Sequence, residues 1–500
     1  MILNNSELEN LLNDVNVNVD IEKRSLYISG KDIDGTFLEN SVVEANRKLQ
    51  LDHSEIDLFQ FVEAVYIQEG TRNINIRVLR MFPNMKSLSL PDSITDTWYW
   101  NEINFRIFEG FTKLEYIKIP AGIQKVNLSI FEECTNLKDI YIPAGIIEIN
   151  QRYLNYKGSL YSITVDQNNP VYSSVDGVLF SKDGTRLISF PVSKIGKYII
   201  PPNTKVIEKG AFSDSCIEEI VINSGTERIE GGAFRNCRKL HSLFISDSVR
   251  YISPEAVGGC CCSNLYDIKV SENNSFFSSV NGSVFTKDKC KLRIAAKIDT
   301  EVFTVPESVL VVGTGAFNGT KYRKIVIPDN VMIIEKNCFD YCEQLEEIVV
   351  CNPNITISES ESNVFSTTNA LNRLKYYSAS PDIHSFIPFG RGKSDVVIAP
   401  NVKLSSVSDD FFPAFAAGFI EMVSDREAMT MEYYQDSITA IKDHISLLED
   451  KMLIDIGVLD FILNQELLPI EEAKKLYNTS LELIDLQFSV YLKEYIEKYS

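Results

Sequence analysis

The chain has 500 residues, of which 44% are hydrophobic and 24% charged, and its formal net charge is -20. These proportions are those of a globular protein and exclude a wholly disordered chain. The negative charge disfavours nucleic acid as the main partner, because phosphate binding needs clustered Lys and Arg. Since a chain of this length exceeds one ordinary core, we predict two or three domains or one long repeat array.

The N-terminal residues have neither the basic start nor the apolar segment of a secretory signal. Nowhere does the chain hold about 18 uninterrupted apolar residues, the length that a membrane-spanning helix needs. We therefore expect a cytoplasmic protein without a membrane span. The alternative is a surface or secreted protein that is exported without a recognisable signal.

Residues 1–58 show no repeat. Between Asp14 and Asp20, valine alternates with Asn and Asp, which predicts a strand. The alternating oxygen ligands superficially resemble a calcium loop, but Val19 and Ser25 stand where that loop needs Gly and Glu. We predict no metal here and assign residues 1–58 to an N-terminal cap on the array that follows.

An interval of 23 residues recurs through the middle of the chain. Three apolar positions recur in pairs at this interval: Leu114, Ile117 and Ile119 with Leu137, Ile140 and Ile142; Ile217, Ile220 and Ile222 with Leu240, Leu243 and Ile245; Tyr322, Ile325 and Ile327 with Leu345, Ile348 and Val350. The last two positions of each set have period two, so both side chains point to one face of a short strand. One such unit cannot bury its apolar face alone, and stacked units share a continuous core. The interval therefore predicts a solenoid.

A longer interval of 105 residues relates two blocks of the chain. Seven residues match across it: Val165, Asn168, Asn169, Ser173, Ser174, Val175 and Gly177 with Val270, Asn273, Asn274, Ser278, Ser279, Val280 and Gly282. Each block continues into a predicted hairpin, with Asp176-Gly177 in the first and Asn281-Gly282 in the second. Asp-Gly between apolar runs favours a tight turn. The pattern indicates that a module of one hairpin plus repeats was duplicated.

These residues resemble the BspA-like, or Treponema-type, leucine-rich repeats of bacteria and some protists. The match covers about residues 75–400 and includes the hairpin at 176–180, Ile200-Pro201 and Gly210-Ala211-Phe212. It implies a mixed α/β repeat fold, a leucine-rich-repeat solenoid of short strands with hairpin inserts, which we place at residues 59–404. It also implies adhesion or protein–protein interaction, often at a cell surface, and no family-wide catalytic residues. The missing secretion signal departs from the surface members of the family.

After Ser405 the apolar spacing changes from that of strands to that of helices. Six residues form the stripe of a predicted helix of about 20 residues: Met431, Tyr434, Ile438, Ile441, Ile445 and Leu448. A second helix is predicted over 456–463, a third begins at Pro469, and a fourth carries Leu481, Ile484, Phe488, Tyr491 and Tyr495. Residues 405–500 are thus predicted to form a small all-α domain, in part similar to ankyrin-like hairpins. It packs on itself or on the last repeat, or else it docks a second partner.

The sequence offers no nucleophile elbow, no zinc-protease helix and no phosphate-binding loop. Its four histidines stand apart from one another. Cys134, Cys237 and Cys342 each follow a phenylalanine by three residues, which indicates buried thiols of a repeat core rather than disulfides. We therefore predict that the protein is not an enzyme and has no catalytic, cofactor-binding or metal-binding residues and no cofactor.

The outward positions beside the buried Ile-x-Ile pairs are the candidate binding residues. They are Tyr116, Lys118, Asp139, Tyr141, Glu219, Val221, Ser242, Phe244, Asp267, Lys269, Lys324, Val326, Glu347 and Val349. Tyr141 and Phe244 are large groups on a surface that need not carry them, so they are candidate anchors for a partner. The alternative is that loops or the C-terminal helices cover this face.

The leading hypothesis is a bacterial interaction or scaffold protein that binds a protein partner through the sheet face. One alternative is a sensor or regulatory subunit of a bacterial defence or toxin–immunity system, in which the helices pass on the signal. A second alternative is a surface adhesin, and a third is an accessory of an enzyme with hidden activity.

Overall fold

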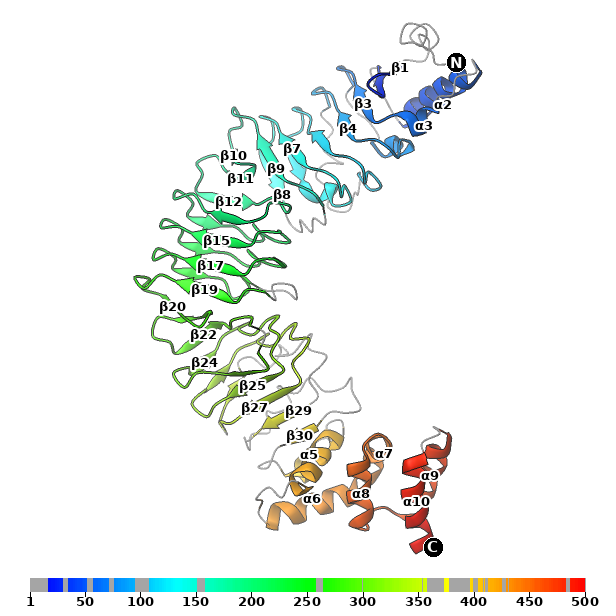
Figure 1. Cartoon of the computed structure of the whole chain (residues 1–500), viewed down its shortest axis with the longest axis vertical. Coiled ribbons are helices and arrows are strands. Elements are labelled where there is room, and N and C mark those ends of the chain that lie inside the picture. The colour runs from blue at the N-terminus through cyan, green and yellow to red at the C-terminus, as the bar shows by residue number, and fades with distance from the viewer. Residues whose placement is uncertain are drawn as a thin grey trace. The chain divides into compact units, whose positions relative to one another are not determined.

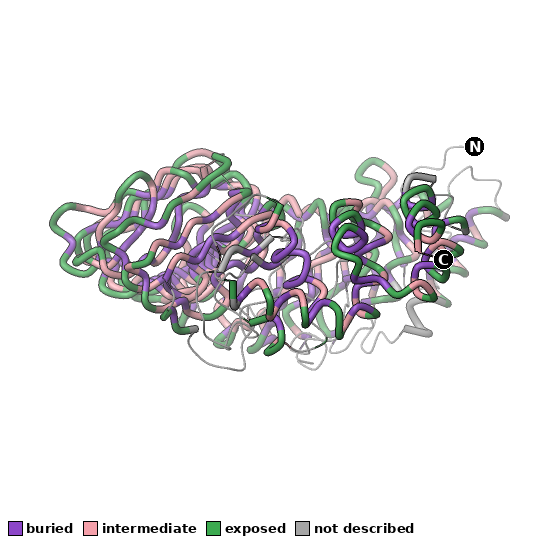
Figure 2. The backbone as a smooth tube through the Cα atoms, turned by 90° about the horizontal axis from the view of Figure 1, so that it is seen from below, coloured by how far each residue is buried: buried purple, intermediate pink, exposed green. Residues whose placement is uncertain are grey.

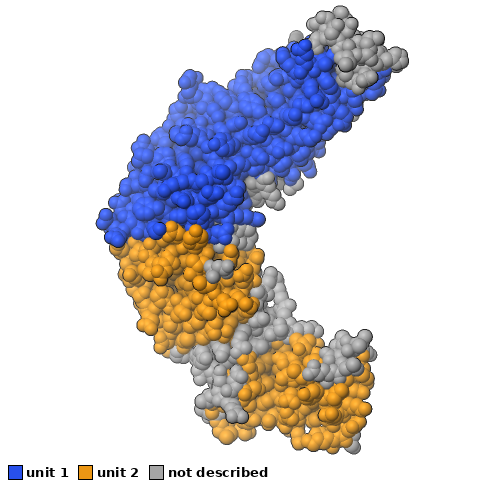
Figure 3. Space-filling model, in the orientation of Figure 1, with its two compact units in different colours: residues 1–265, 269–276 blue, residues 266–268, 277–500 orange. Residues whose placement is uncertain are grey.

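The computed structural model describes residues 17–29, 35–51, 57–71, 76–94, 108–150, 158–257, 264–298, 300–352, 354–357, 373–376, 396–398, 403–407, 409, 412–424, 429, 431–482 and 486–499. The chain divides into two compact units (Figure 3). Unit 1 holds residues 1–265 and 269–276, and unit 2 holds residues 266–268 and 277–500. Each unit is described by itself.

Unit 1 begins with a sheet of seven strands (Figure 1). In sheet order these are β1 (Val17–Asp20), β2 (Ser25–Ile28), β3 (Ala64–Ile67), β4 (Ser87–Ser89), β5 (Tyr116–Lys118), β7 (Asp139–Ile142) and β9 (Ser162–Val165). β1 pairs antiparallel with β2, and every later pair is parallel. β6 (Lys125–Asn127) and β8 (Glu148–Asn150) pair with each other in a second, two-stranded sheet. Each complete turn of the solenoid thus adds one strand to the main sheet.

The core of this first sheet is a row of apolar side chains in register. The row consists of Leu26, Val65, Leu88, Ile117, Ile140 and Ile163, and each is 0% exposed. Buried and exposed residues alternate along the strands because side chains of a strand alternate between its faces (Figure 2). Helix α2 (Gly35–Leu51) adds Val42, Ala45 and Leu49 to the same core. The segment predicted as a cap therefore shares the sheet and the core of the repeats.

The first hairpin module follows in unit 1. The hairpin strands lead into one sheet, made of β10 (Tyr172–Val175), β11 (Val178–Ser181), β12 (Arg186–Ser189), β14 (Val206–Ile207), β16 (Arg228–Ile229) and β18 (Tyr251–Ile252). β13 (Lys197–Ile199), β15 (Glu219–Ile222) and β17 (Ser242–Ile245) run parallel in a second sheet. Asp176 and Gly177 form the predicted hairpin turn with φ of 51° and 74°. A Cβ at Gly177 would lie 2.9 Å from Ser162 Oγ, so the turn also packs closely on β9.

Unit 2 repeats this architecture. Its hairpin sheet contains β20 (Phe277–Val280), β21 (Ser283–Thr286), β22 (Lys291–Ile294), β24 (Val311–Val312), β26 (Ile333–Ile334) and β28 (Thr356–Ile357). Its second sheet contains β23 (Val302–Thr304), β25 (Lys324–Ile327), β27 (Glu347–Val350), β29 (Arg373–Tyr376) and β30 (Val396–Ile398). β19 (Asp267–Val270) has residues in both units. The duplication and the hairpin inserts predicted from the sequence are thus present in the fold.

Buried polar groups tie successive turns together. Asn169 is 0% exposed, and its amide donates hydrogen bonds to the carbonyls of Pro143 and Ile146 in the preceding turn. Asn274 does the same with the carbonyls of Ser246 and Val249. These bonds give the carbonyl groups of the preceding turn a side-chain donor, and a buried carbonyl without a donor is costly.

The three cysteines that follow a phenylalanine are buried thiols, as predicted. Cys134, Cys237 and Cys342 each lie close enough to donate a hydrogen bond to the carbonyl of a phenylalanine in the preceding turn, at 3.7, 3.0 and 3.1 Å. Burial raises the pKa of the Cys134 thiol to about 12. The described cysteines form no disulfide.

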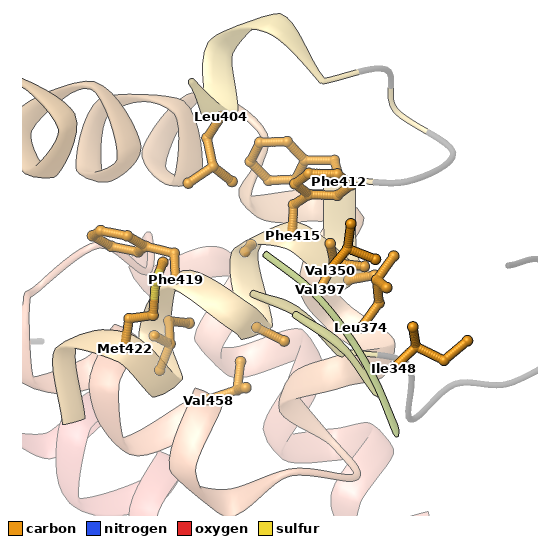
Figure 4. Close-up of a cluster of buried hydrophobic side chains, with 14 of the residues drawn as sticks. Ile348, Val350, Leu374, Val397, Leu404, Phe412, Phe415, Phe419, Met422 and Val458 are labelled. Carbon is orange, nitrogen blue, oxygen red and sulfur yellow. The ribbon is translucent and has the colours of Figure 1, made fainter. Parts of the chain in front are cut away.

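The C-terminal helices continue the core of the last repeats in unit 2. They are α5 (Phe412–Ser424), α6 (Met431–Asp443), α7 (Glu449–Met452), α8 (Ile456–Asn464), α9 (Ile470–Glu482) and α10 (Leu486–Tyr499). Helix α5 packs on β30, and Figure 4 shows Phe412 and Phe415 beside Val350 and Val397. One hydrophobic cluster therefore runs from the strands into the helices, so the helices pack on the last repeat.

Two helix predictions need correction. The stripe predicted as one helix over 431–448 is broken at His444, where α6 ends and a short 3₁₀ turn, η5 (Ile445–Leu448), begins. The exposed fraction of Met431 is 73%, so that end of the stripe lies on the surface. Leu481, assigned to the fourth helix, lies in α9 instead.

Candidate binding surface

The predicted surface residues fall on the outward faces of three parallel strand pairs. Tyr116 and Lys118 of β5 are in register with Asp139 and Tyr141 of β7. In the second sheet of unit 1, Glu219 and Val221 of β15 are in register with Ser242 and Phe244 of β17. In unit 2, Lys324 and Val326 of β25 are in register with Glu347 and Val349 of β27. Parallel pairing therefore brings the predicted residues together two by two, while Asp267 and Lys269 lie on β19.

Exposure differs among these positions. Tyr116 is 43% exposed and Phe244 is 37% exposed, so both rings offer apolar surface to a partner. Ile199 of β13, which the sequence analysis did not select, is 53% exposed and in register with Val221. Ile199, Val221 and Phe244 thus form an apolar row across three strands. Val349 is only 9% exposed and offers little surface, contrary to its predicted outward position.

Tyr141 is held by a hydrogen bond and is not a freely rotating anchor. Its hydroxyl donates to Asp166 Oδ2 at 2.6 Å. This bond and, to a lesser extent, burial raise the pKa of Tyr141 to about 12. The same bond lowers the pKa of Asp166, so that the carboxylate stays ionised. The ring of Tyr141 is therefore fixed in one orientation on the sheet face.

Most charged side chains on these faces form ion pairs between neighbouring turns. Lys118 Nζ lies 3.1 Å from Asp92 Oδ2, Lys197 Nζ lies 3.6 Å from Glu219 Oε2, and Lys324 Nζ lies 3.1 Å from Glu347 Oε2. Exposed pairs of this kind contribute little to stability, about 0–1 kcal/mol each. Each of these pairs cancels one positive and one negative charge on or beside a face.

Two tyrosines on the face of the first sheet were not among the predicted surface residues. Tyr27 and Tyr66 are in register on β2 and β3, and their rings stack with centroids 4.9 Å apart at an interplanar angle of 12°. The signal that points to them is the buried pair beside each ring, Leu26 with Ile28 and Val65 with Ile67. These pairs have the same period of two as the later repeats.

A separate hollow of about 530 Å³ lies on the hairpin sheet of unit 1. It is lined by side chains of both charges, among them Arg186, Glu208, Arg228 and Glu230. Arg186 pairs with Glu208, and Arg228 pairs with Glu230 and lies over the ring of Tyr251. These four lining charges are thus paired with one another within the protein.

The described residues contain no group of three or more His, Cys, Asp or Glu side chains that could hold a metal ion. In the same part of the chain, no helix is long and apolar enough to cross a membrane. The predicted cytoplasmic location stays a prediction.

The region with these repeated faces matches a known family. The model described as the BspA type leucine rich repeat region matches residues 59–182, 188–299 and 297–387 with six copies. The chain belongs to the BspA-type leucine-rich repeat family. Membership is confirmed over the strands that carry the candidate surface and over both hairpin modules, and this fold is one that favours protein–protein interaction.

Several solved structures are similar to this BspA-type protein. The pneumococcal vaccine antigen PcpA is 17% identical over 76% of this chain and 74% of its own, with a TM-score of 0.37. A leucine-rich repeat protein of Eubacterium ventriosum is 19% identical over 77% and 91%, with a TM-score of 0.37. A leucine-rich cell surface protein of Faecalibacterium prausnitzii is 21% identical over 60% and 74%, with a TM-score of 0.32. No curated protein matches the chain. These identities and TM-scores are too low to transfer a role from any of these proteins.

Proposed function

We propose that this BspA-type protein is an interaction or scaffold protein that binds another protein through the sheet faces of its solenoid. The observation that carries the proposal is the exposure of Tyr116 and Phe244 on the sheet faces, in register with other outward side chains. Exposed aromatic rings on a rigid scaffold supply contact area at a low cost in conformational entropy. The two exposed rings do not fill the core, since the buried side chains of the same strands already do so.

Cross-linking in a lysate, followed by identification of the captured protein, tests this proposal. Tyr116→Ser combined with Phe244→Ser should reduce recovery of the partner by about tenfold or more, because central aromatic side chains dominate binding energy. Tyr251→Ser is the matched control, since Tyr251 is 37% exposed but lies on β18 in the hairpin sheet. Equal recovery with the double variant and with the control would contradict the proposal.

A regulatory role is the second candidate, and the shared core of strands and helices favours it. Val397 of β30 and Phe412 of α5 lie in one buried cluster, so a shift in the last strands would reach the helices. We expect hydrogen exchange in α8 and α9 to slow when the captured partner binds the solenoid. Unchanged hydrogen exchange in α8 and α9 would contradict the regulatory role, and the scaffold role would be the single remaining proposal. The adhesin and accessory-enzyme hypotheses have no support from the described residues.

A further inference from the structure

We propose that the first sheet of unit 1 binds a basic polypeptide segment across its strands. The surface is defined by Tyr27, Tyr66, Tyr116, Asp139 and Tyr141, and we call it the tyrosine face. This inference rests on the proposed function, in which a sheet face binds protein. It specifies the sheet face that binds and the positive charge of the partner.

Strand register places the tyrosines in two outward rows. One row runs Tyr27, Tyr66, Ser89, Lys118, Tyr141 and Thr164 across β2 to β9. The other runs Ser25, Ala64, Ser87, Tyr116, Asp139 and Ser162 across the same strands. The small side chains of β4 thus separate the ring of Tyr66 from the large side chains of β5. Tyrosine beside serine and alanine is a composition suited to recognising protein surfaces.

The carboxyl edge of these strands is acidic. Glu69, Asp92 and Asp166 follow β3, β4 and β9. Among the described outward residues of β2, β3, β4, β5, β7 and β9, Lys118 is the single cation, and its ammonium group pairs with Asp92. Asp139 adds a carboxylate to the face itself. The row that holds Tyr27, Tyr66 and Tyr141 therefore borders an edge with more negative than positive charge.

Aromatic rings next to carboxylates favour Lys and Arg as ligands. A cation over a tyrosine ring is attracted to the negative face of the ring, and a nearby carboxylate adds a charge-assisted hydrogen bond. Tyr116 is 43% exposed, and Asp139 is its in-register neighbour. The net charge of -20 on the whole chain also attracts a basic partner over long distances.

The dimensions fit a short extended peptide. Five steps between neighbouring strands separate β2 from β9, which is about 24 Å at the usual strand spacing. An extended chain covers that distance with about seven residues. Alternate residues of such a segment would face the sheet, so three or four basic side chains can reach the rings and carboxylates.

The test uses the full chain and two labelled synthetic peptides of about seven residues, one alternating Arg with Ser and one alternating Glu with Ser. Fluorescence anisotropy measures their binding at low and high salt. We expect the Arg peptide to bind at least about tenfold more tightly than the Glu peptide, with an affinity that falls as salt rises. The same affinity for both peptides, or no binding of either, would overturn the inference.

A matched pair of variants locates the binding. Tyr116→Ser with Asp139→Asn should weaken the Arg peptide by about tenfold. Tyr251→Ser with Glu227→Gln also removes one tyrosine ring and one negative charge, here at and directly before strands of the hairpin sheet, and it should change the affinity by less than about twofold. Equal weakening by both pairs would show general attraction to an acidic protein and would overturn the inference.

Failure of this inference is distinguishable from failure of the proposed function. If the cross-linked partner contacts a sheet face through an acidic or neutral segment, the proposed function stands and the basic partner is wrong. If the Arg peptide binds the tyrosine face but the cross-linked partner maps outside every sheet face, the proposed function is wrong and the peptide chemistry stands.

Discussion

The two hairpin modules share the turn that joins their second and third strands, β11 to β12 in the first module and β21 to β22 in the second. They differ in the charged side chains on their surfaces. Asp183 in the first and Asp288 in the second each accept hydrogen bonds across the turn, from Ser181 and Thr185 and from Thr286 and Cys290. These bonds lower the pKa of both carboxyl groups, that of Asp183 to about 2. The groups that close the turn are thus kept across the duplication.

The outward ion pairs differ because of one position. In the first module Arg186 pairs with Glu208, one turn away. In the second module Gly313 stands at the equivalent position, and Lys291 reaches past it to Glu335, two turns away. A Cβ at Gly313 would lie 3.0 Å from Lys291 Cε, so a side chain there would obstruct this path. Turn geometry is therefore held by several bonds at once, whereas the surface pattern changes with single residues.

The largest effect on stability is expected at the turn between β20 and β21 of the second module. In Gly282→Ala the new Cβ would lie 2.0 Å from the carbonyl oxygen of Tyr266, at a φ of 76°. We expect a loss of about 3 kcal/mol or more in the free energy of unfolding, because backbone must move. Gly184→Ala is the control, since Gly184 has a φ of 71° and no atom within 4 Å of its Cβ. It should cost only about 1 kcal/mol. Urea unfolding measures both, and equal losses would contradict the packing argument.

Removal of a buried asparagine should have the next largest effect. Asn274→Ala leaves the carbonyls of Ser246 and Val249 without their donor and the Phe276 amide without its acceptor. We expect a loss of about 2–3 kcal/mol in unfolding free energy, and the same for Asn169→Ala. The exposed neighbour Asn273 is the control, with an expected change of about 0.5 kcal/mol or less for Asn273→Ala. A large difference between the two buried positions would show that the copies are not equivalent.

Removal of an ion pair should reduce stability less, and by different amounts in the two modules. Burial alone would raise the pKa of Glu335, but hydrogen bonds from Lys291 and Thr314 outweigh it and lower the pKa. A lowered folded-state pKa stabilises the protein above the unfolded value of about 4.3, and this contribution is lost as pH falls through the folded value. Lys291→Met should therefore cost about 1 kcal/mol at neutral pH and less in acid.

The control for this pair is Arg186→Met. The side chain of Arg186 is 59% exposed, whereas that of Lys291 is 25% exposed. Solvent screens the Arg186 pair more strongly, so we expect a loss near zero at every pH. Thermal unfolding from pH 7 to pH 3 measures both variants. A deficit for Lys291→Met that grows in acid would reverse the assigned sign.

Thiol labelling should have the smallest effect on the fold. Cys290 is partly exposed at the second hairpin, whereas Cys338 is buried, and burial raises the pKa of the Cys338 thiol. Iodoacetamide should modify Cys290 in the native protein with no measurable shift of the melting temperature, and should reach Cys338 only on unfolding. Mass spectrometry of native and unfolded samples checks this. Native labelling of Cys338 would mean that the core of unit 2 opens readily.

Much of the fold could be predicted because it depends on short-range patterns. The Ile117 and Ile119 pair and its repeats at fixed intervals predict the buried rows, and Asp176-Gly177 predicts the turn. These features need only neighbouring residues, so a single sequence contains them.

The candidate surface depends on longer-range placement and was harder to predict. The bond from Tyr141 to Asp166 joins residues 25 positions apart, and it requires the register between a strand and the following loop. Tyr27 was not predicted because α2 lies between β2 and β3 and interrupts the interval. Tyr66 keeps the interval of 23 residues to its partner on β4, but that partner is Ser89, so no large outward side chain recurs there. Burial of Val349 could not be predicted from its position beside Ile348 and Val350 alone.

The helical end of the core limits how this array can lengthen. Val397 on the last strand lies in one apolar cluster with Phe412 and Phe415 of α5. A new turn appended after β30 would separate those rings from their strand and would have to present a matching apolar surface at once. A turn inserted between existing turns meets the same surfaces on both sides and disturbs neither end. Growth of such an array therefore favours internal copying, and the 105-residue duplication is growth of that kind.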